Sequence, residues 1–191
     1  MTRKRKPIFF VACEGAHNKT ESNYLQHFKN NNGVSLKIKP TSNTAPETML
    51  DYIYHYAQNN GYEKRSGDKI FMICDIDTKE KRHRLCQDNF LAQARKKNVT
   101  VIMSNPSFEV WFLDHFIFTS HCFSSQKEII QCLKQYLPKY KKSDDVYPSL
   151  PPWTIAKKNA IRQWASPRDN IPESPGTNVD VLLDALNIER K

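Results

Sequence analysis

The sequence predicts an α/β fold: a parallel sheet of roughly four strands flanked by helices, followed by a C-terminal helical extension. Two observations support this prediction. Short runs of apolar or alternating residues, each bounded by polar residues, are typical of strands. Segments with apolar residues at helical spacing separate these runs, so strands and helices alternate along the chain. This order is typical of a parallel sheet with helices on both faces.

The expected strands differ in how deeply they should be buried. The runs 8–13 and 69–74 are continuously apolar, which is typical of central strands in a parallel sheet. In the run 34–39, apolar residues alternate with polar ones, which indicates a half-buried strand at the edge of the sheet. A fourth strand is expected over residues 99–103.

Helices are expected between and after these strands. Thr20 and Glu21 open the first, and Pro46 and Pro106 each suit the first position of a helix. Asn105 is expected to cap the helix that Pro106 begins. The expected helices cover residues 20–29, 46–58, 79–97, 106–118, 125–137, 153–165 and 178–186.

The length of the chain predicts one compact domain. Within it, we expect a core over residues 1–120 that contains the sheet. Residues 121–191 are expected to form a helical extension packed on this core.

The chain is strongly basic, with a formal net charge of +9. Lys and Arg gather at residues 3–6, 79–84, 95–97, 139–142 and 157–158. A basic surface attracts polyanions, and nucleic acid is the commonest of them. The alternative is a solvated basic face with no function.

Cysteine usage and hydropathy favour a cytoplasmic protein that has no membrane partner. No pair among the five cysteines has Cys-x-x-Cys spacing, which argues against a zinc site or a redox pair. Two of them lie in expected buried strands, as fits a reducing compartment. No apolar run is long enough to span a bilayer, and the first ends too early, at Glu14, for a signal peptide.

Acidic residues follow two of the expected strands. Glu14 comes directly after the first apolar run, and Asp75 and Asp77 follow the run 69–74. Ligands of open α/β sheets bind beyond the carboxyl ends of the strands, so these carboxylates are expected to converge there. Converging carboxylates repel one another unless a cation joins them, and oxygen ligands suit Mg²⁺ or Mn²⁺.

Each acidic position also has an ordinary structural interpretation. Asp-x-Asp is common at strand ends and turns, and Glu14-Gly15 can be a strand-ending turn. Thr20-Glu21 is interpreted first as a helix cap with a favourable acid in the first turn. Glu109 is expected near the start of its helix, where the helix dipole stabilises it, or else as a fourth carboxylate of the site.

Spacing excludes several rival sites. The haloacid-dehalogenase-type phosphatases place Thr or Val two residues after the second Asp, whereas Asp77 is followed by Thr78 and Lys79. The chain has no Gly-x-x-x-x-Gly-Lys-Ser/Thr loop for a nucleoside triphosphate. Its six histidines show no metal-ligand spacing.

Several blocks of the chain resemble the RloB-like family, which includes the second component of the AbiL abortive-infection system. The resemblance spans nearly the whole sequence, and Ser-Asn-Pro-x-Phe-Glu-x-Trp is its most specific block. The matching blocks are Cys13-Glu14-Gly15, Lys19-Thr20-Glu21, Asp75-Ile76-Asp77, Ser104 to Phe112, Tyr140-Lys141-Lys142-Ser143 and Thr177-Asn178-Val179. One departure is the insertion of Ala16-His17-Asn18 before Lys19, which makes the first loop slightly longer than usual in the family.

The resemblance implies a Toprim-like core, like that of topoisomerases, primases and OLD-type nucleases. It also implies Mg²⁺-dependent phosphodiester chemistry, and a role in antiviral defence beside a partner ATPase encoded nearby. By the same resemblance, Lys142 is a candidate for stabilising charge on the reacting phosphate, the alternative being a solvated lysine in a basic run.

The sequence thus predicts a metal-dependent nuclease that acts on DNA or RNA. Glu14, Asp75 and Asp77 are the expected catalytic and metal-binding residues, with Glu109 as a further ligand and Lys142 as a catalytic cation. The alternative is a non-catalytic nucleic-acid-binding or regulatory subunit of a defence complex. A second alternative is another Toprim chemistry, such as strand passage or nucleotidyl transfer. Strand passage needs a nucleophilic tyrosine on a further domain, and this chain is short for that. The sequence leaves the oligomeric state open. The residues expected to bind the nucleic-acid backbone are Lys19, Lys79, Lys81, Arg82, Arg84 and Lys141.

Overall fold

A five-stranded, mostly parallel sheet forms the centre of the computed structural model, which describes residues 5–15, 20–29, 33–42, 45–87, 89–164 and 170–186. Within these residues the strand order is β2-β1-β3-β4-β5, and only β5 runs antiparallel to its neighbour. The strands are β1 (Ile8–Glu14), β2 (Ser35–Thr41), β3 (Lys69–Asp75), β4 (Val99–Asn105) and β5 (Gly176–Thr177). The α/β fold class and the parallel sheet predicted from the sequence are confirmed.

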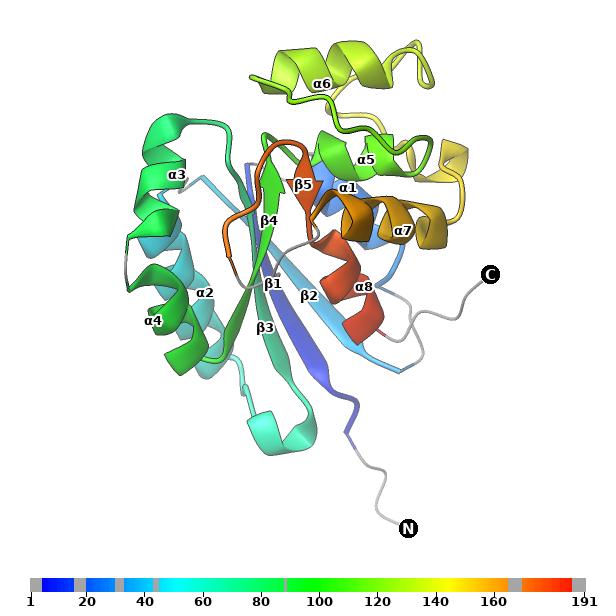
Figure 1. The fold of residues 1–191 in the computed structure, drawn as a ribbon. Coiled ribbons are helices and arrows are strands. Elements are labelled where there is room, and N and C mark those ends of the chain that lie inside the picture. The colour runs from blue at the N-terminus through cyan, green and yellow to red at the C-terminus, as the bar shows by residue number, and fades with distance from the viewer. Residues whose placement is uncertain are drawn as a thin grey trace.

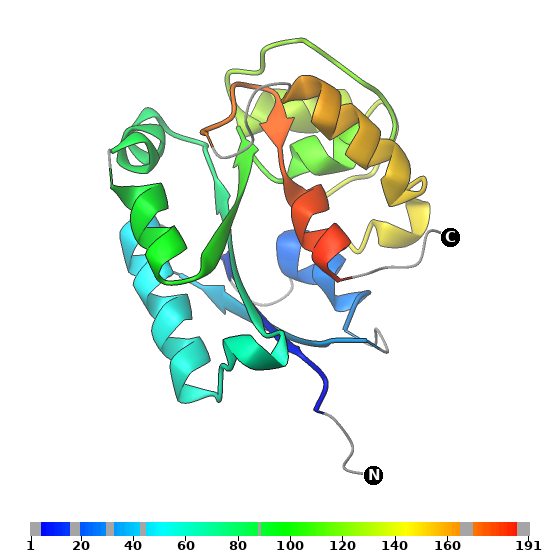
Figure 2. The same cartoon turned by 60° about the horizontal axis from the view of Figure 1, so that its bottom comes forward.

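Helices cover both faces of the sheet (Figures 1 and 2). On one side lie α2, α3 and α4; on the other lie α1, α5, α7 and α8, with α6 stacked beyond α5. The α-helices are α1 (Thr20–Gln26), α2 (Pro46–Asn59), α3 (Lys79–Cys86), α4 (Phe90–Lys96), α5 (Glu109–Asp114), α6 (Gln126–Leu133), α7 (Trp153–Gln163) and α8 (Val179–Ala185). Two short 3₁₀ helices, η1 (Lys64–Ser66) and η2 (Tyr147–Ser149), complete the described elements. None of the described helices combines the length and the apolar character needed to cross a bilayer.

Alternating residues of the central strands serve two separate cores. On β1, Phe9 and Val11 pack toward α1 and α5, whereas Phe10 and Ala12 pack toward α2 and α4. Successive side chains of a strand point to opposite faces, and here both faces are covered, so a continuous apolar run is required. The largest fully buried side chain is Trp111 of α5, which lies in the first core.

The structure divides the helix expected over 79–97 into α3 and α4. The backbone of Gln87 is extended, with φ −58° and ψ 133°, and ends α3. Leu85 and Phe90 both pack into the core below these helices. In one continuous helix, residues five apart point about 140° away from each other, so the break allows both side chains to face the sheet.

The helix expected from Pro106 begins later, and the strand before it ends later. Asn105 is the last residue of β4 instead of a helix cap, and its side-chain amide donates a hydrogen bond to the carbonyl of Pro172 over 2.9 Å. The two-residue strand β5, where a loop was expected, pairs with Ser104 and Asn105 at the end of β4 and adds a fifth strand to the four expected. The C-terminal third of the chain therefore contributes a strand as well as helices to the fold.

The side chain of Asn178 covers part of the β4 edge that β5 is too short to reach. Its Oδ1 accepts a hydrogen bond from the backbone N–H of Met103 over 2.7 Å, and its Nδ2 donates to the carbonyl of Val101 over 3.3 Å. Its backbone N–H donates to the carbonyl of Met103 over 3.2 Å. One amide side chain thus replaces two backbone partners of a neighbouring strand.

Candidate functional site

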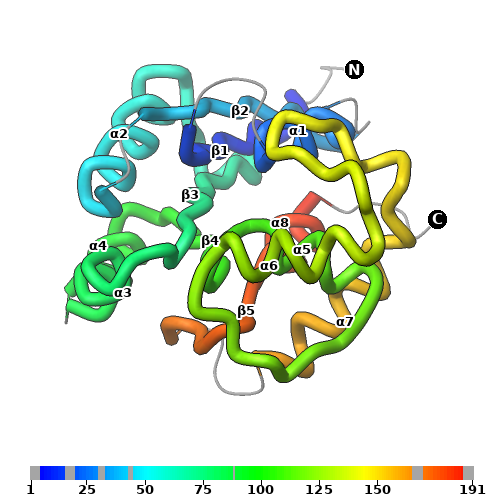
Figure 3. The backbone as a smooth tube through the Cα atoms, turned by 90° about the horizontal axis from the view of Figure 1, so that it is seen from above, coloured from blue at the N-terminus to red at the C-terminus, as the bar shows by residue number. Residues whose placement is uncertain are grey.

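The carboxyl ends of β1 and β3 bring Glu14 and Asp75 together, as the sequence predicts. Each is the last residue of its strand, and the two strands are parallel neighbours. The backbone N–H of Asp75 donates a hydrogen bond to Oε1 of Glu14 over 3.3 Å. Seen along the strands in Figure 3, this end of the sheet lies between α2 and α3 on one side and α1, α5 and α6 on the other.

Two helices add buried carboxylates to this end of the sheet. Glu21 lies in the first turn of α1 and Glu109 begins α5, and their exposed fractions are 6% and 1%. The carboxylate of Glu109 accepts hydrogen bonds from Ser107 Oγ (2.7 Å), Gln126 Nε2 (3.0 Å) and the Tyr140 hydroxyl (2.9 Å). Glu109 is therefore held in place by three donors from three different segments.

The four carboxylates of Glu14, Glu21, Asp75 and Glu109, the acidic cluster, influence one another electrostatically. Burial raises the pKa of Asp75 well above its usual range, and the charges of Glu21, Glu14 and Glu109 raise it further. Burial also raises the pKa of Glu21 to about 7, and Glu109 and Glu14 contribute to that rise. Buried like charges disfavour ionisation, so the cluster attracts protons or a cation.

The ammonium group of Lys81 already occupies one cationic position in this site. Its Nζ lies 2.8 Å from each carboxylate oxygen of Glu14 and 3.1 Å from Oδ1 of Asp77. Burial lowers the pKa of Lys81, but the hydrogen bonds and charge of Glu14 outweigh burial and raise it. Lys81 therefore remains charged at neutral pH.

Asp77 and Lys142 lie at the margins of the cluster. Asp77 follows β3 in the loop before α3, and its side chain is 43% exposed. The backbone carbonyl of Lys142 accepts a hydrogen bond from Oγ1 of Thr20 over 3.2 Å, and the Lys142 charge lowers the pKa of Glu21. The fold thus brings the 139–142 basic segment beside the carboxylates, although more than 100 residues separate it from β1.

The basic residues predicted to bind nucleic acid differ in their surroundings. Lys79 and Lys141 are exposed, whereas Lys81 is buried against Glu14. Arg82 pairs with Glu173 at 2.5 Å, and Arg84 pairs with Glu80 and Glu47. Lys19 lies outside the described residues. On α3, therefore, neighbouring acids balance three of the predicted cations.

The oxygen ligands of this site fit the chemistry of Mg²⁺ or Mn²⁺. Asp75 is 8% exposed, and its Oδ1 has no hydrogen-bond partner among the described residues, as is expected of an oxygen that accepts a cation. Even so, no three His, Cys, Asp or Glu side chains in the described ranges are grouped as metal ligands. The ammonium of Lys81 contacts both carboxylate oxygens of Glu14, one of the expected ligands.

Glu21 is the site residue that sequence reasoning assigned to another role. Thr20 and Glu21 are interpreted from the sequence as a helix cap with a first-turn acid, and Glu21 does lie in the first turn of α1. Its burial among Glu14, Asp75 and Glu109 depends on contacts between elements, which local pattern does not reveal. The Lys-Thr-Glu block in the family resemblance is the signal that points to it.

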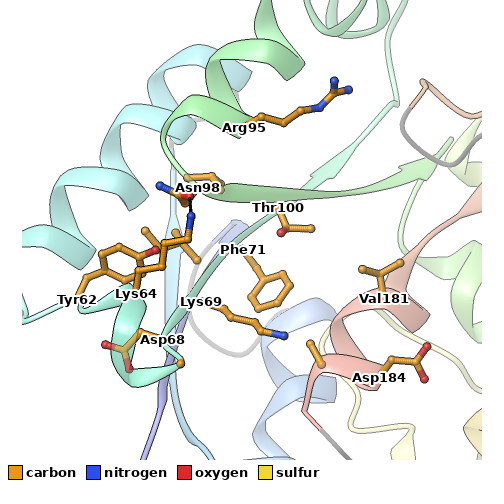
Figure 4. Close-up of a pocket in the computed structure, with 14 residues that line it drawn as sticks. Tyr62, Lys64, Asp68, Lys69, Phe71, Arg95, Asn98, Thr100, Val181 and Asp184 are labelled. Carbon is orange, nitrogen blue, oxygen red and sulfur yellow. Dashed lines mark hydrogen bonds between the residues drawn. The ribbon is translucent and has the colours of Figure 1, made fainter.

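A concave feature lies at the opposite end of the sheet from the acidic cluster. A groove of about 750 Å³ runs between the amino ends of β3 and β4 and helix α8 (Figure 4). Lys64, Lys69 and Arg95 line it, and none of them forms an ion pair within the described residues. Its two acids, Asp68 and Asp184, are each paired with a basic residue outside the groove. The groove is therefore positively charged and separate from the acidic cluster.

Comparison with known proteins assigns the family. The sequence matches the family described as RloB-like protein over residues 9–186, which is nearly the whole chain. This range includes the acidic cluster, Lys81 and the 139–142 segment. No curated protein and no solved structure matches the chain. The chain belongs to the RloB-like protein family.

Proposed function

We propose that this RloB-like protein is a metal-dependent nuclease that hydrolyses phosphodiester bonds of DNA or RNA. The observation that carries the proposal is the acidic cluster at the carboxyl ends of β1 and β3, where ligands of open α/β sheets bind. Burial and the charges of the neighbouring carboxylates raise the pKa values of Asp75 and Glu21, and one buried oxygen of Asp75 lacks a described partner. Such a cluster is costly to maintain without a cation, which favours a functional role over a structural one.

The proposed roles follow from where each side chain lies. Glu14, Asp75, Asp77 and Glu109 would hold one or two Mg²⁺ or Mn²⁺ ions, and Glu21 adds a carboxylate to the same site. A bound divalent ion supplies a water nucleophile of lowered pKa and stabilises charge on the leaving oxygen. Tyr140 holds Glu109 in position through its hydroxyl. Lys142, whose charge lowers the pKa of Glu21, would neutralise charge on a phosphate at the cluster.

Exposed cations beside the cluster support a nucleic-acid substrate. Lys79 on α3 and Lys141 in the segment after α6 are exposed, and the chain carries a formal net charge of +9. Contacts of this kind bind the phosphate backbone without reading sequence. Arg82 and Arg84 form ion pairs with acidic residues, which reduces their contribution to nucleic-acid binding. Lys79, Lys141 and Lys142 are therefore the main proposed contacts with the phosphate backbone.

The proposed biological role is antiviral defence in the cytoplasm, through abortive infection, together with a partner ATPase. This part rests on the family resemblance alone. An ATPase gene next to the gene for this chain is the genomic observation that would support it.

Incubating the purified protein with plasmid, linear DNA and RNA tests the nuclease proposal. We expect cleavage with Mg²⁺ or Mn²⁺ and none with EDTA, because the carboxylates act through a divalent ion. Glu14→Gln is expected to reduce the rate at least about 100-fold, the usual effect of removing one electrostatic group from an active site. The matched control is Glu63→Gln, the same chemical change at an exposed residue before η1.

Two outcomes of this experiment would contradict the proposal. One is undiminished cleavage by Glu14→Gln, which would place the activity elsewhere or in a contaminant. The other is the absence of cleavage on every substrate and with both metals, with and without the partner ATPase.

The second candidate function is a non-catalytic nucleic-acid-binding or regulatory subunit. The specific observation in its favour is the groove of Figure 4, whose three cations have no acidic partner in the described part of the chain. For this function, fluorescence anisotropy in EDTA is expected to show binding that weakens steeply with salt. The double variant Lys69→Gln/Arg95→Gln should then weaken binding about tenfold more than Lys141→Gln, whereas the nuclease proposal predicts the opposite order.

A further inference from the structure

Lys81 makes the closest charge contacts in the candidate site. Its ammonium lies 2.8 Å from both oxygens of Glu14 and 3.1 Å from Asp77. The side chains of Lys81 and Glu14 are only 9% and 13% exposed, whereas that of Asp77 is 43% exposed. The ammonium therefore has a buried partner on one side and a solvated partner on the other.

The start of α3 fixes where this ammonium can reach. Thr78 caps the helix, and its side-chain oxygen accepts a hydrogen bond from the backbone N–H of Lys81 over 3.1 Å. Lys81 therefore leaves the helix in its first turn, directly after the loop that follows Asp75. Lys79, two residues earlier on the same helix, is exposed. The position of Lys81 at Glu14 is thus set by the fold and is not a general property of this basic helix.

A divalent cation and the Lys81 ammonium compete for the carboxylate of Glu14. The ammonium occupies the position between the two oxygens, where a metal ion would chelate, and a divalent ion on the remaining lone pairs would strongly repel it. The cluster nevertheless retains an unsatisfied acceptor, because the buried Oδ1 of Asp75 has no partner among the described residues. The site therefore has one cationic position filled by the chain itself and one acceptor that the chain leaves open.

We propose that Lys81 is a residue of the catalytic site that competes with the divalent cation for Glu14. Without metal, the ammonium neutralises Glu14 and keeps the carboxylates assembled. When a first metal ion binds Glu14, Lys81 is displaced toward Asp77, its other partner, which in this state pairs with the ammonium and does not coordinate that ion. A cleft of about 350 Å³ lined by Asp77, Thr78, Lys81 and Arg84 provides space on that side. This proposal rests on the proposed function, since it takes the acidic cluster to be the metal site.

The displaced ammonium would lie where a substrate approaches. Asp77 is solvated, so the ammonium beside it can contact a phosphate of the nucleic-acid backbone. Metal binding would then convert a buried counter-ion into a substrate-binding group. The site would therefore bind the nucleic-acid backbone more readily when it holds a metal ion than when it does not.

Measuring Mn²⁺ affinity tests the competition without reference to cleavage. Titrations followed by calorimetry, and by the electron paramagnetic resonance signal of free Mn²⁺, are compared for the wild-type chain, Lys81→Met and Lys79→Met. We expect Lys81→Met to lower the Kd for Mn²⁺ at least about tenfold, because a repelling charge is removed. Lys79→Met, which makes the same charge change on the exposed part of α3, is expected to shift the Kd less than about twofold. Lys81→Arg keeps the charge and is expected to retain an affinity close to that of the wild type.

Thermal unfolding gives an independent readout. In EDTA, Lys81→Met should unfold at a lower temperature than the wild type, since Glu14 loses its partner. Saturating Mn²⁺ should raise its unfolding temperature by more than it raises that of the wild type. If Lys81→Met does not give enough folded protein, Lys81→Gln is the second variant, with the same expected direction.

The competition is overturned if Lys81→Met binds Mn²⁺ as tightly as the wild type or more weakly, or if neither protein binds Mn²⁺. A tighter Kd in the variant supports the competition even if no substrate is cleaved. In that case the nuclease proposal would fail while the competition stood. Conversely, cleavage that depends on Mn²⁺ together with an unchanged Kd would support the nuclease and reject the role of Lys81.

Discussion

Asp75→Asn is expected to stop cleavage and at the same time to make the fold more stable. Loss of activity follows from removing a carboxylate that the proposed site uses to hold a divalent ion, and a fall of at least about 100-fold is expected. The gain in stability follows from burial. Asp75 is the last residue of β3 and is buried near other carboxylates, so its pKa is raised well above the usual range. Asparagine fills the same space without a charge.

The sign of the stability effect can be derived from this pKa. A carboxyl group whose folded-state pKa is above its unfolded value of about 4 destabilises the native state wherever it must ionise. The advantage of Asp75→Asn is therefore largest at pH 8, decreases as the pH falls through the folded-state pKa, and disappears below about pH 4. At pH 8 we expect Asp75→Asn to raise the free energy of unfolding by about 1–2 kcal/mol, as is usual when a destabilising functional residue is replaced.

Urea unfolding in EDTA at several pH values measures the change. Asp51→Asn is the matched control, since Asp51 is exposed on α2 and pairs with Lys97 at the surface. Saturating Mn²⁺ is expected to reverse the order at pH 8, because only the wild type keeps the full set of ligands. A variant that is less stable than the wild type at pH 8 in EDTA would show that Asp75 is a structural acid.

Glu109→Ala is expected to have the opposite effect on stability, although Glu109 belongs to the same acidic cluster. Its carboxylate accepts hydrogen bonds from Ser107, Gln126 and Tyr140, of which Ser107 and Tyr140 are buried. Each buried donor left unpaired costs about 1–3 kcal/mol. The relief of repulsion toward Asp75 and Glu21 offsets only part of this cost. We expect a net loss of about 2–3 kcal/mol in the free energy of unfolding.

A second substitution at this position separates lost hydrogen bonds from lost charge. Glu109→Gln keeps one acceptor oxygen and the side-chain volume, so it should lose less than half as much stability as Glu109→Ala in the same urea titrations. Equal losses for the two variants would mean that the charge of Glu109 stabilises the fold, contrary to the donor network described above. Both variants are expected to cleave poorly if Glu109 contributes to the metal site.

The central sheet and two members of the acidic cluster follow from local sequence pattern. Continuous apolar runs identify β1 and β3 because strands covered on both faces tolerate few polar residues. Glu14 and Asp75 directly follow those runs, and parallel neighbours end at the same edge of a sheet. Their proximity is therefore predictable before any contact is known.

Other features depend on contacts between distant segments. The strand β5 has two residues, too few for any periodic pattern, and it exists because Gly176 and Thr177 lie beside the end of β4. The interaction of Lys81 with Glu14 depends on how α3 leaves β3, which a run of basic residues does not reveal. Similarly, the first turn of α1 looks like a helix cap in the sequence, and only the packing of α1 on the sheet places Glu21 among the other acids.

The amide of Asn178 has a consequence for how the protein behaves at high concentration. Open strand edges invite other chains to add to a sheet, and proteins block them with lysine, proline or covering groups. Asn178 occupies hydrogen-bonding groups on the β4 side, while the opposite edge strand, β2, carries Lys37, Lys39 and Pro40. Both borders of the sheet are thus protected against strand addition. Assembly with other copies or with a partner is accordingly expected to use helical surfaces, and Asn178→Ala should promote aggregation.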